Sequence, residues 1–268
     1  MKSRRPQLTR WASLVGLLVL QAAGTALAQD RSVSSLGRIE PDGGIVQVAG
    51  PSGGCISGSV IRSLEVQEGD WVEEGQIVAY LDSYDLHKAE VARLQAVYVN
   101  ASSEMERQNN LSLTSATSKV KLDQAVMDLA IAEADLAASR ARLDLSVVRA
   151  PVAAQVLEIH AAPGERVGVE GVLELGRTNR MYVVAEVYET DISLVAKGQR
   201  ASINLAALSQ PLSGTVERVS LKVGRLDVIG TDPVDKTDAR VVEVYILLDD
   251  SAAVSGYTNM QVEVEISA

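Results

Sequence analysis

Residues 84–146 form a stretch of 63 residues without glycine or proline, the two residues that most often interrupt helices. In its second half leucine recurs every seven positions, and a small residue follows each of the first three leucines by three. These positions are Leu122, Leu129, Leu136 and Leu143, with Ala125, Ala132 and Ser139 between them. A seven-residue spacing of this kind predicts a helix that packs along one seam.

The first half of the stretch carries a matching four-three alternation at Val91, Leu94, Tyr98, Ala101 and Met105. The segment 112–118 between the halves is rich in serine and threonine and poor in seam residues. Two antiparallel helices folded back on each other satisfy both seams within one chain, as a coiled-coil hairpin about 45 Å long. A dimeric leucine zipper remains open as the alternative.

The segments on either side of the helical stretch repeat each other at an offset of 95 residues. Each copy predicts an alternating apolar strand, a turn containing glycine and a second short strand. The corresponding pairs are Ile61 and Val156, Leu64 and Ile159, Gly69 and Gly164, Val72 and Val167, Ile77 and Val172. Two such halves resemble the flattened β-sandwich of lipoyl and biotinyl carrier domains, with the hairpin inserted between them.

Carrier domains bear their modified lysine in an exposed turn where the two halves meet. The nearest candidate here, Lys88, follows His87 in the first turns of the expected helix. A solvated helical lysine is the simpler interpretation, and a carrier function remains a minor alternative.

The last part of the chain predicts a small β-barrel. Strands are expected at Met181–Val187, Ala201–Leu205, Leu212–Val223, Arg240–Leu248 and Met260–Ile266, and Thr190 or Asp191 can cap a short helix. The loop 227–238 holds four aspartates without EF-hand spacing, so a solvated acidic loop is favoured over a calcium site.

The N-terminus resembles a secretory signal peptide. Lys2, Arg4, Arg5 and Arg10 precede an apolar run, and Ala26-Leu27-Ala28 fits a cleavage site. The 18 uncharged residues 11–28 are also just long enough for a retained membrane anchor. In either case we expect the rest of the chain to lie in the periplasm, associated with the inner membrane.

Composition excludes several function classes. The net charge of −10 disfavours nucleic acid as a partner, because phosphate binding needs a surplus of Lys and Arg. One cysteine, Cys55, excludes an internal disulfide framework, and two histidines offer little for a zinc hydrolase. No nucleotide-binding loop or convincing catalytic motif is visible. We therefore assign no catalytic, cofactor-binding or metal-binding residues, and expect no enzyme.

These segments predict a mostly β, elongated chain with one helical hairpin. The expected parts are a signal peptide (1–28), an N-terminal strand with the first half of the lipoyl-like domain (29–82), the coiled-coil hairpin (83–148), the second half of the lipoyl-like domain (149–179) and the β-barrel (180–268).

This order of parts resembles the periplasmic membrane fusion proteins of the HlyD type, the efflux adaptors, and within them the DevB-type subfamily that serves ABC exporters. Three stretches carry the resemblance: Leu36-Gly37-Arg38-Ile39-Glu40-Pro41; the run from Leu175 to Asp191; and Val223-Gly224-Arg225 with the run from Asp238 to Val244. Arg149-Ala150-Pro151 is a more general adaptor element. The hairpin is short for the DevB type.

The resemblance implies a homo-oligomeric ring, expected to be a hexamer, between an inner-membrane ABC transporter (permease plus ATPase) and a TolC-like outer-membrane channel. It implies export of a lipid-like or other hydrophobic substrate, and no cofactor. Members of this family often carry arginine, leucine and serine at the hairpin tip, a pattern that Arg107, Leu111 and Ser118 match. An adaptor of a proton-driven drug pump or of a metal efflux pump is the alternative.

Overall fold

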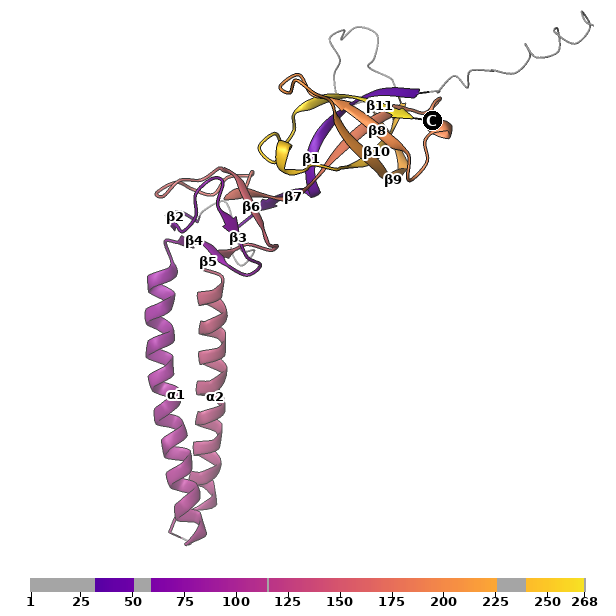
Figure 1. Cartoon of the computed structure of the whole chain (residues 1–268). Coiled ribbons are helices and arrows are strands. Elements are labelled where there is room, and N and C mark those ends of the chain that lie inside the picture. The colour runs from indigo at the N-terminus through magenta and orange to yellow at the C-terminus, as the bar shows by residue number, and fades with distance from the viewer. Residues whose placement is uncertain (1–31, 51–58, 115, 226–239, 268) are drawn as a thin grey trace, which may run out of the picture.

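The structure, a computed structural model, describes residues 32–50, 59–114, 116–225 and 240–267. A helical hairpin, a small β-sandwich and a β-barrel follow one another in an elongated molecule (Figure 1). The expected fold class is thereby confirmed: mostly β, with a helical hairpin inserted into a split sandwich. The segment 1–28, Cys55 and the acidic loop 227–238 lie outside the described residues.

The hairpin consists of two long helices, α1 (Tyr84–Leu113) and α2 (Lys119–Asp144). With 30 and 26 residues they are about 45 and 39 Å long. They run side by side and are joined by a short connection at the end farthest from the β domains (Figure 1). Ser118 begins α2, and its side chain accepts a hydrogen bond from the backbone N–H of Lys121 at 3.4 Å.

Six described strands close the barrel in the order β1, β11, β8, β9, β10, β7, and β7 pairs back with β1. They are β1 (Ser32–Val48), β7 (Leu173–Tyr188), β8 (Arg200–Asn204), β9 (Leu212–Arg225), β10 (Arg240–Leu248) and β11 (Gln261–Ser267). Alternating side chains point inward, so that β11 buries Val262, Val264 and Ile266. The helix expected after Asp191 is a single 3-10 turn, η2 (Ile192–Leu194); a second, η3 (Ala252–Val254), precedes β11.

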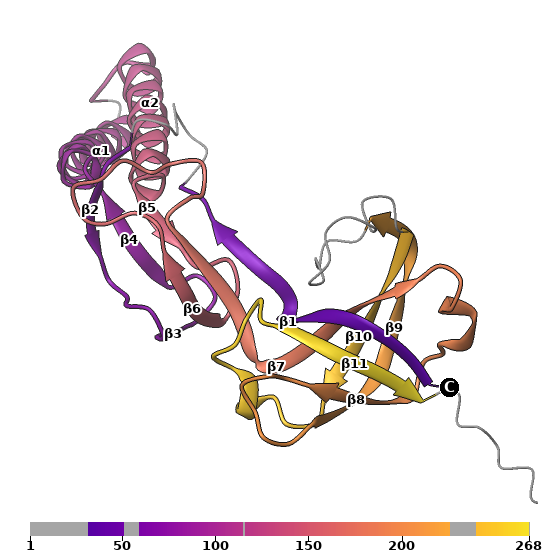
Figure 2. The ribbon, with the colours of Figure 1, turned by 90° about the horizontal axis from the view of Figure 1, so that it is seen from above.

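The first strand takes part in both β domains. Residues 29–82 are expected to hold an N-terminal strand and the first half of the lipoyl-like domain, and the N-terminal half of β1 pairs with β11 and β7 in the barrel. Val33 and Ile39 are buried in the barrel core. The strand bends at a bulge containing Gly43 and Gly44, whose φ angles are +80° and +77°, and then continues into the sandwich. The paired ribbons β1 and β7 thus connect the two β domains (Figure 2).

The sandwich packs a three-stranded sheet, β2-β4-β5, against β3, β6 and the ends of β1 and β7. The remaining strands are β2 (Ile61–Leu64), β3 (Trp71–Val72), β4 (Ile77–Leu81), β5 (Val147–Arg149) and β6 (Ala154–Ile159). One core of buried aliphatic side chains, drawn from both halves of the repeat, lies between the layers.

The repeat of the sequence appears in the sandwich as twofold pseudo-symmetry. Ile61 N–H donates to Glu165 O and Gly164 N–H donates to Ile61 O, at 2.8 and 2.7 Å. At the positions 95 residues away, Val156 N–H donates to Asp70 O and Gly69 N–H to Val156 O, both at 2.8 Å. Each half therefore completes the other half's turn, and both turn glycines adopt positive φ angles.

Candidate functional site

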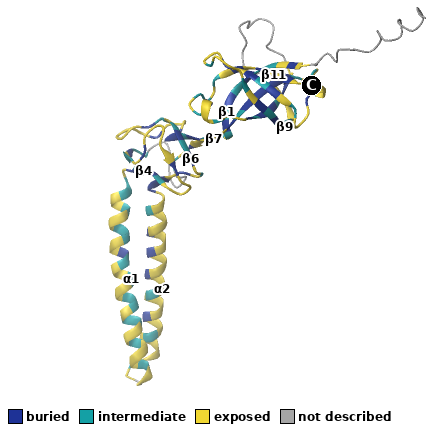
Figure 3. Cartoon of the chain, in the orientation of Figure 1, coloured by how far each residue is buried: buried dark blue, intermediate teal, exposed yellow. Residues whose placement is uncertain are grey.

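The seam residues of the hairpin all lie on its inward side. Leu94, Ala125, Ala132, Leu136 and Ser139 are buried, and the other predicted positions are half-buried. This second group comprises Val91, Tyr98, Ala101, Met105, Leu122, Leu129 and Leu143. The side chains facing away from the seam are mostly exposed (Figure 3).

The tip of the hairpin exposes the three residues singled out in the sequence. The Arg107 side chain is 62% exposed and pairs with Glu104 at 2.6 Å. Leu111 is 37% exposed, and its carbonyl oxygen accepts hydrogen bonds from the backbone N–H groups of Thr114 and Ala116. Leu113 beside it is 79% exposed. The tip therefore offers a guanidinium and two leucines to a partner.

Ser118 has a structural role that the spacing alone did not reveal. As the N-cap of α2, Ser118 accepts a hydrogen bond from the Lys121 N–H, one of the backbone N–H groups in the first helical turn that have no partner within the helix. Its neighbour Thr117 donates to the Gln108 amide oxygen at 2.6 Å and so ties the connection to α1. Two side chains thus hold the turn in shape below the exposed leucines.

The three stretches that carry the family resemblance meet at one ion network in the barrel. Arg38 on β1 pairs with Glu40, with Glu186 on β7 at 3.1 Å and with Glu243 on β10 at 3.4 Å. Glu186 is 2% exposed. These strands are neighbours, so one guanidinium can offset part of the negative charge of three carboxylates that are far from one another in the sequence.

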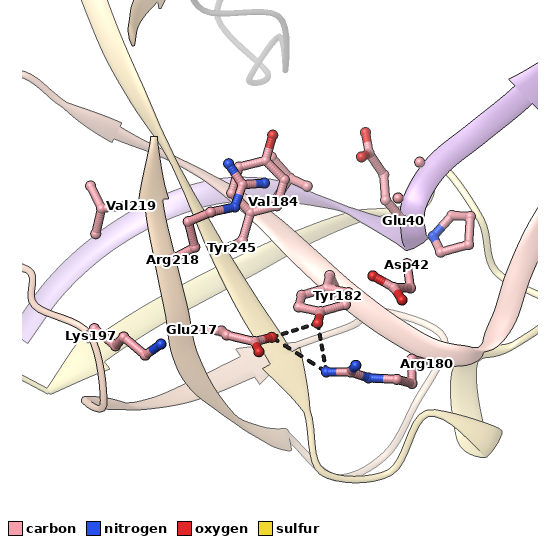
Figure 4. A pocket seen from close by; sticks show the side chains of 13 residues that line it. Glu40, Asp42, Arg180, Tyr182, Val184, Lys197, Glu217, Arg218, Val219 and Tyr245 are labelled. Carbon is pink, nitrogen blue, oxygen red and sulfur yellow. Dashed lines mark hydrogen bonds and ion pairs between the residues drawn. The ribbon is translucent and has the colours of Figure 1, made fainter. Parts of the chain in front are cut away.

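A polar cleft of about 890 Å³ lies on the outside of the barrel beside the β1 bulge (Figure 4). Tyr182 donates to Glu217 and accepts from Arg180 at 2.8 Å, as Figure 4 shows. Burial and the hydrogen bond to Glu217 raise the pKa of Tyr182 to about 12. The guanidinium of Arg218 stacks over the ring of Tyr245, with its Cζ atom 3.5 Å from the ring centre. Charges of both signs line the cleft, which suits a polar protein surface better than an apolar small molecule.

One cluster of candidate metal ligands was missed by the sequence analysis. Glu158, His160 and Glu174 each place a ligand atom within 4.8 Å of the others. Glu158 and His160 are two residues apart, whereas Glu174 belongs to the next strand. The sequence spacing of Glu158 and His160 was available as a signal, but it does not show which residues of β7 they face.

The lysine considered for the carrier alternative, Lys88, lies in a helix. Lys88 lies in the first turns of α1, with its Nζ atom 5.7 Å from the centre of the Tyr84 ring. It does not occupy the tight turn that a modified lysine needs. No helix among the described residues combines the length and the apolar character that a bilayer crossing requires.

No protein-family model matches the chain. Among curated proteins, it is 28% identical over 184 residues to the macrolide export protein MacA of Yersinia pestis, with 57% of this chain and 49% of that protein covered. The chain thus spans about half the length of this relative.

Two solved structures share the fold over most of the chain. A MacA-MexA chimeric protein containing the Pseudomonas aeruginosa MexA α-hairpin domain superposes with a TM-score of 0.69 at 19% identity, covering 89% of this chain and 79% of the chimera. The membrane fusion protein Spr0693 of Streptococcus pneumoniae R6 superposes with a TM-score of 0.65 at 16% identity, covering 88% and 99%. The fold is therefore that of solved membrane fusion proteins.

Proposed function

We propose that this chain is the periplasmic adaptor of a tripartite ABC-type exporter and links an inner-membrane ABC transporter to a TolC-like outer-membrane channel. The observation that carries the proposal is the insertion of a long hairpin between the two halves of a lipoyl-like sandwich, followed by a barrel. Sequence similarity to a macrolide export protein supports the ABC class. The DevB-type motifs favour a lipid-like or other hydrophobic substrate.

The proposed docking site for the channel is the hairpin tip, with Arg107, Leu111 and Ser118. Exposed Leu111 and Leu113 supply an apolar contact that a helical partner can bury. Arg107 supplies a planar hydrogen-bonding group. Among the described residues its side chain forms an ion pair with Glu104 only, so most of the guanidinium is open to a partner. Ser118 contributes by fixing the start of α2, so that the turn presents these side chains in one geometry.

The proposed assembly is a homo-oligomeric ring, with six copies as the expected number. Apolar side chains away from the seam support lateral contacts, since Val97, Val99, Val126, Met127 and Ile131 are between 44% and 53% exposed. The role is non-enzymatic: ATP hydrolysis belongs to the transporter. The segment 1–28 is proposed to direct the chain across the inner membrane, and cleavage is favoured over anchoring.

A substitution at the tip tests the proposal. Leu111→Asp places a charge in the docking contact without touching the core of either β domain, so export should be abolished while expression and transporter binding persist. Leu86→Asp is the matched control, because Leu86 is 71% exposed near the base of α1. Normal export by Leu111→Asp would contradict docking at the tip.

Arg107→Lys separates charge from shape at the same site. Lysine keeps the positive charge but lacks the planar fork of the guanidinium. Export should weaken without being lost.

The class of the pump is tested by the transporter that co-purifies with this chain. Recovery of the adaptor with a proton-driven transporter, in place of an ATP-hydrolysing one, would move the chain to another pump class.

A further inference from the structure

Two glutamates on neighbouring strands of the sandwich face each other directly. Glu158 of β6 and Glu174 of β7 are register partners in the antiparallel pairing. Like charges directly opposite each other destabilise a strand pair unless something neutralises them. Gln47 of β1 donates from Nε2 to Glu174 Oε1 at 3.4 Å, but an amide brings no charge.

A histidine lies between these two carboxylates. The His160 side chain is only 13% exposed; its Nε2 atom is 3.4 Å from Glu174 Oε1, and Nδ1 is 3.9 Å from Glu158 Oε1. Nε2 is buried and makes no hydrogen bond within the described part of the chain. Buried polar atoms are rarely left in this state, so the orphaned nitrogen points to a partner that is still to be placed.

A fourth charged group lies beside the cluster. Glu170 Oε2 is 4.0 Å from His160 Nδ1, and the Glu170 side chain is 72% exposed in the turn before β7. With neutral His160, the four side chains carry a formal charge of −3. Imidazole together with carboxylates is a donor set that suits borderline cations, of which zinc is the commonest in proteins.

We propose that Glu158, His160 and Glu174 bind a divalent transition-metal ion of the zinc class, and that Glu170 adds negative charge beside the site. The ion neutralises the facing carboxylates and gives the orphaned imidazole nitrogen a partner. It also ties the end of β6 to the start of β7, across the loop that carries Glu170. Gln47 holds Glu174 in place from the adjacent strand, as outer partners of metal ligands commonly do. This site is independent of the proposed docking at the tip.

Zinc binding by the whole chain tests the site. The protein is stripped of metal with a chelator and titrated with ZnCl2 against a chromogenic zinc indicator, and its thermal unfolding midpoint is followed in parallel. We expect one site of defined affinity and a rise in the midpoint, because a ligand of the folded state stabilises it. CaCl2 at the same concentration should shift the midpoint less, since calcium prefers an all-oxygen shell.

Three variants locate the site. His160→Gln and Glu174→Gln should each weaken zinc binding at least about tenfold. Glu158→Gln should do the same and should not impair folding, because this side chain is 63% exposed. His87→Gln removes the chain's other histidine and should bind as the wild type does.

Two results would overturn the proposal. One is the same zinc affinity in the wild type and in both His160→Gln and Glu158→Gln, which would assign binding to scattered surface carboxylates. The other is no competition with the indicator and no change in the midpoint, which would show that protons alone neutralise the cluster.

Discussion

The hairpin and the barrel bury their apolar side chains to very different extents. In the barrel a contiguous cluster of aliphatic residues is almost completely buried, and Ile39, Ile203, Ile246 and Ile266 are all 0% exposed. In the two hairpin helices only Leu94, Ala125, Ala132, Leu136 and Ser139 are buried. Figure 3 shows the contrast as a dark barrel interior and a narrow broken line along the helices.

This difference shows where each part gains its stability. The barrel contains its own core of buried aliphatic side chains. The hairpin buries alternating leucine and small residues along one seam and leaves valines, a methionine and an isoleucine on its outer faces. Two helices that bury so little are marginal by themselves, and partners that cover those faces would complete them.

The largest loss of stability should follow a cavity in the barrel. Ile246→Ala deletes three carbons from a fully buried side chain and should lower the free energy of unfolding by about 3 kcal/mol. Urea denaturation followed by near-UV circular dichroism measures this loss. Ile246→Val, which removes one methylene, should cost about 1 kcal/mol. Equal, small effects of both variants would show that the barrel core is loosely packed.

The corresponding truncation in the hairpin should cost less. Leu136 is 4% exposed, and Leu136→Ala should lower the stability of the hairpin by about 2 kcal/mol, because solvent reaches a narrow seam more easily than a barrel core. The circular dichroism signal of the helices, followed during urea denaturation, measures this loss of stability. Val120→Ala is the matched control: Val120 is 77% exposed, and the change should stay within about 0.5 kcal/mol. A loss for Val120→Ala as large as for Leu136→Ala would contradict the seam.

Loss of the helix cap should have a smaller effect still. Ser118→Ala removes the acceptor for the Lys121 N–H, and at 3.4 Å this bond should contribute about 0.5 kcal/mol. Ser118→Asp retains an acceptor at the helix N-terminus and should preserve stability. Thermal unfolding of the helical signal measures both. If Ser118→Asp loses as much stability as Ser118→Ala, the cap is not what Ser118 provides.

The smallest effect concerns a surface ion pair of the barrel. The hydrogen bond from Arg200 holds the pKa of Asp249 below its usual value of 3.8. Because the folded pKa lies below the unfolded one, the pair stabilises at neutral pH, and this contribution disappears as the pH falls below about 4. The difference between wild type and Arg200→Gln in urea midpoint should therefore be small at pH 7 and vanish near pH 2. A difference that grows in acid would contradict this.

The sequence predicted the elements whose periodicity is local. The leucine heptads placed the second helix and the four-three alternation placed the first, since glycine and proline occur only outside them. The 95-residue offset paired Ile61 with Val156, whose backbone hydrogen bonds mirror each other in the structure. The strand at 240–248 was placed with its observed bounds.

What the sequence could not show depends on pairing between distant segments. The bulge of β1 at Asp42–Ile45 follows from its pairing with β7, which continues beside it. The meeting of His160 and Glu174 likewise follows from the register of β6 against β7, which no local pattern reveals. Ser118 matched a spacing, but only the structure showed it as a helix cap.

Crosslinking from the hairpin tip tests the central claim, that this chain reaches an outer-membrane channel, most directly. A cysteine at Leu113, which is 79% exposed, is introduced in a Cys55→Ser background, and a cysteine at Leu86 near the base of α1 is the control. The account predicts that, in cells, Leu113→Cys captures the outer-membrane channel and Leu86→Cys does not. Crosslinks from Leu113→Cys only to other copies of this chain, while export continues, would contradict it.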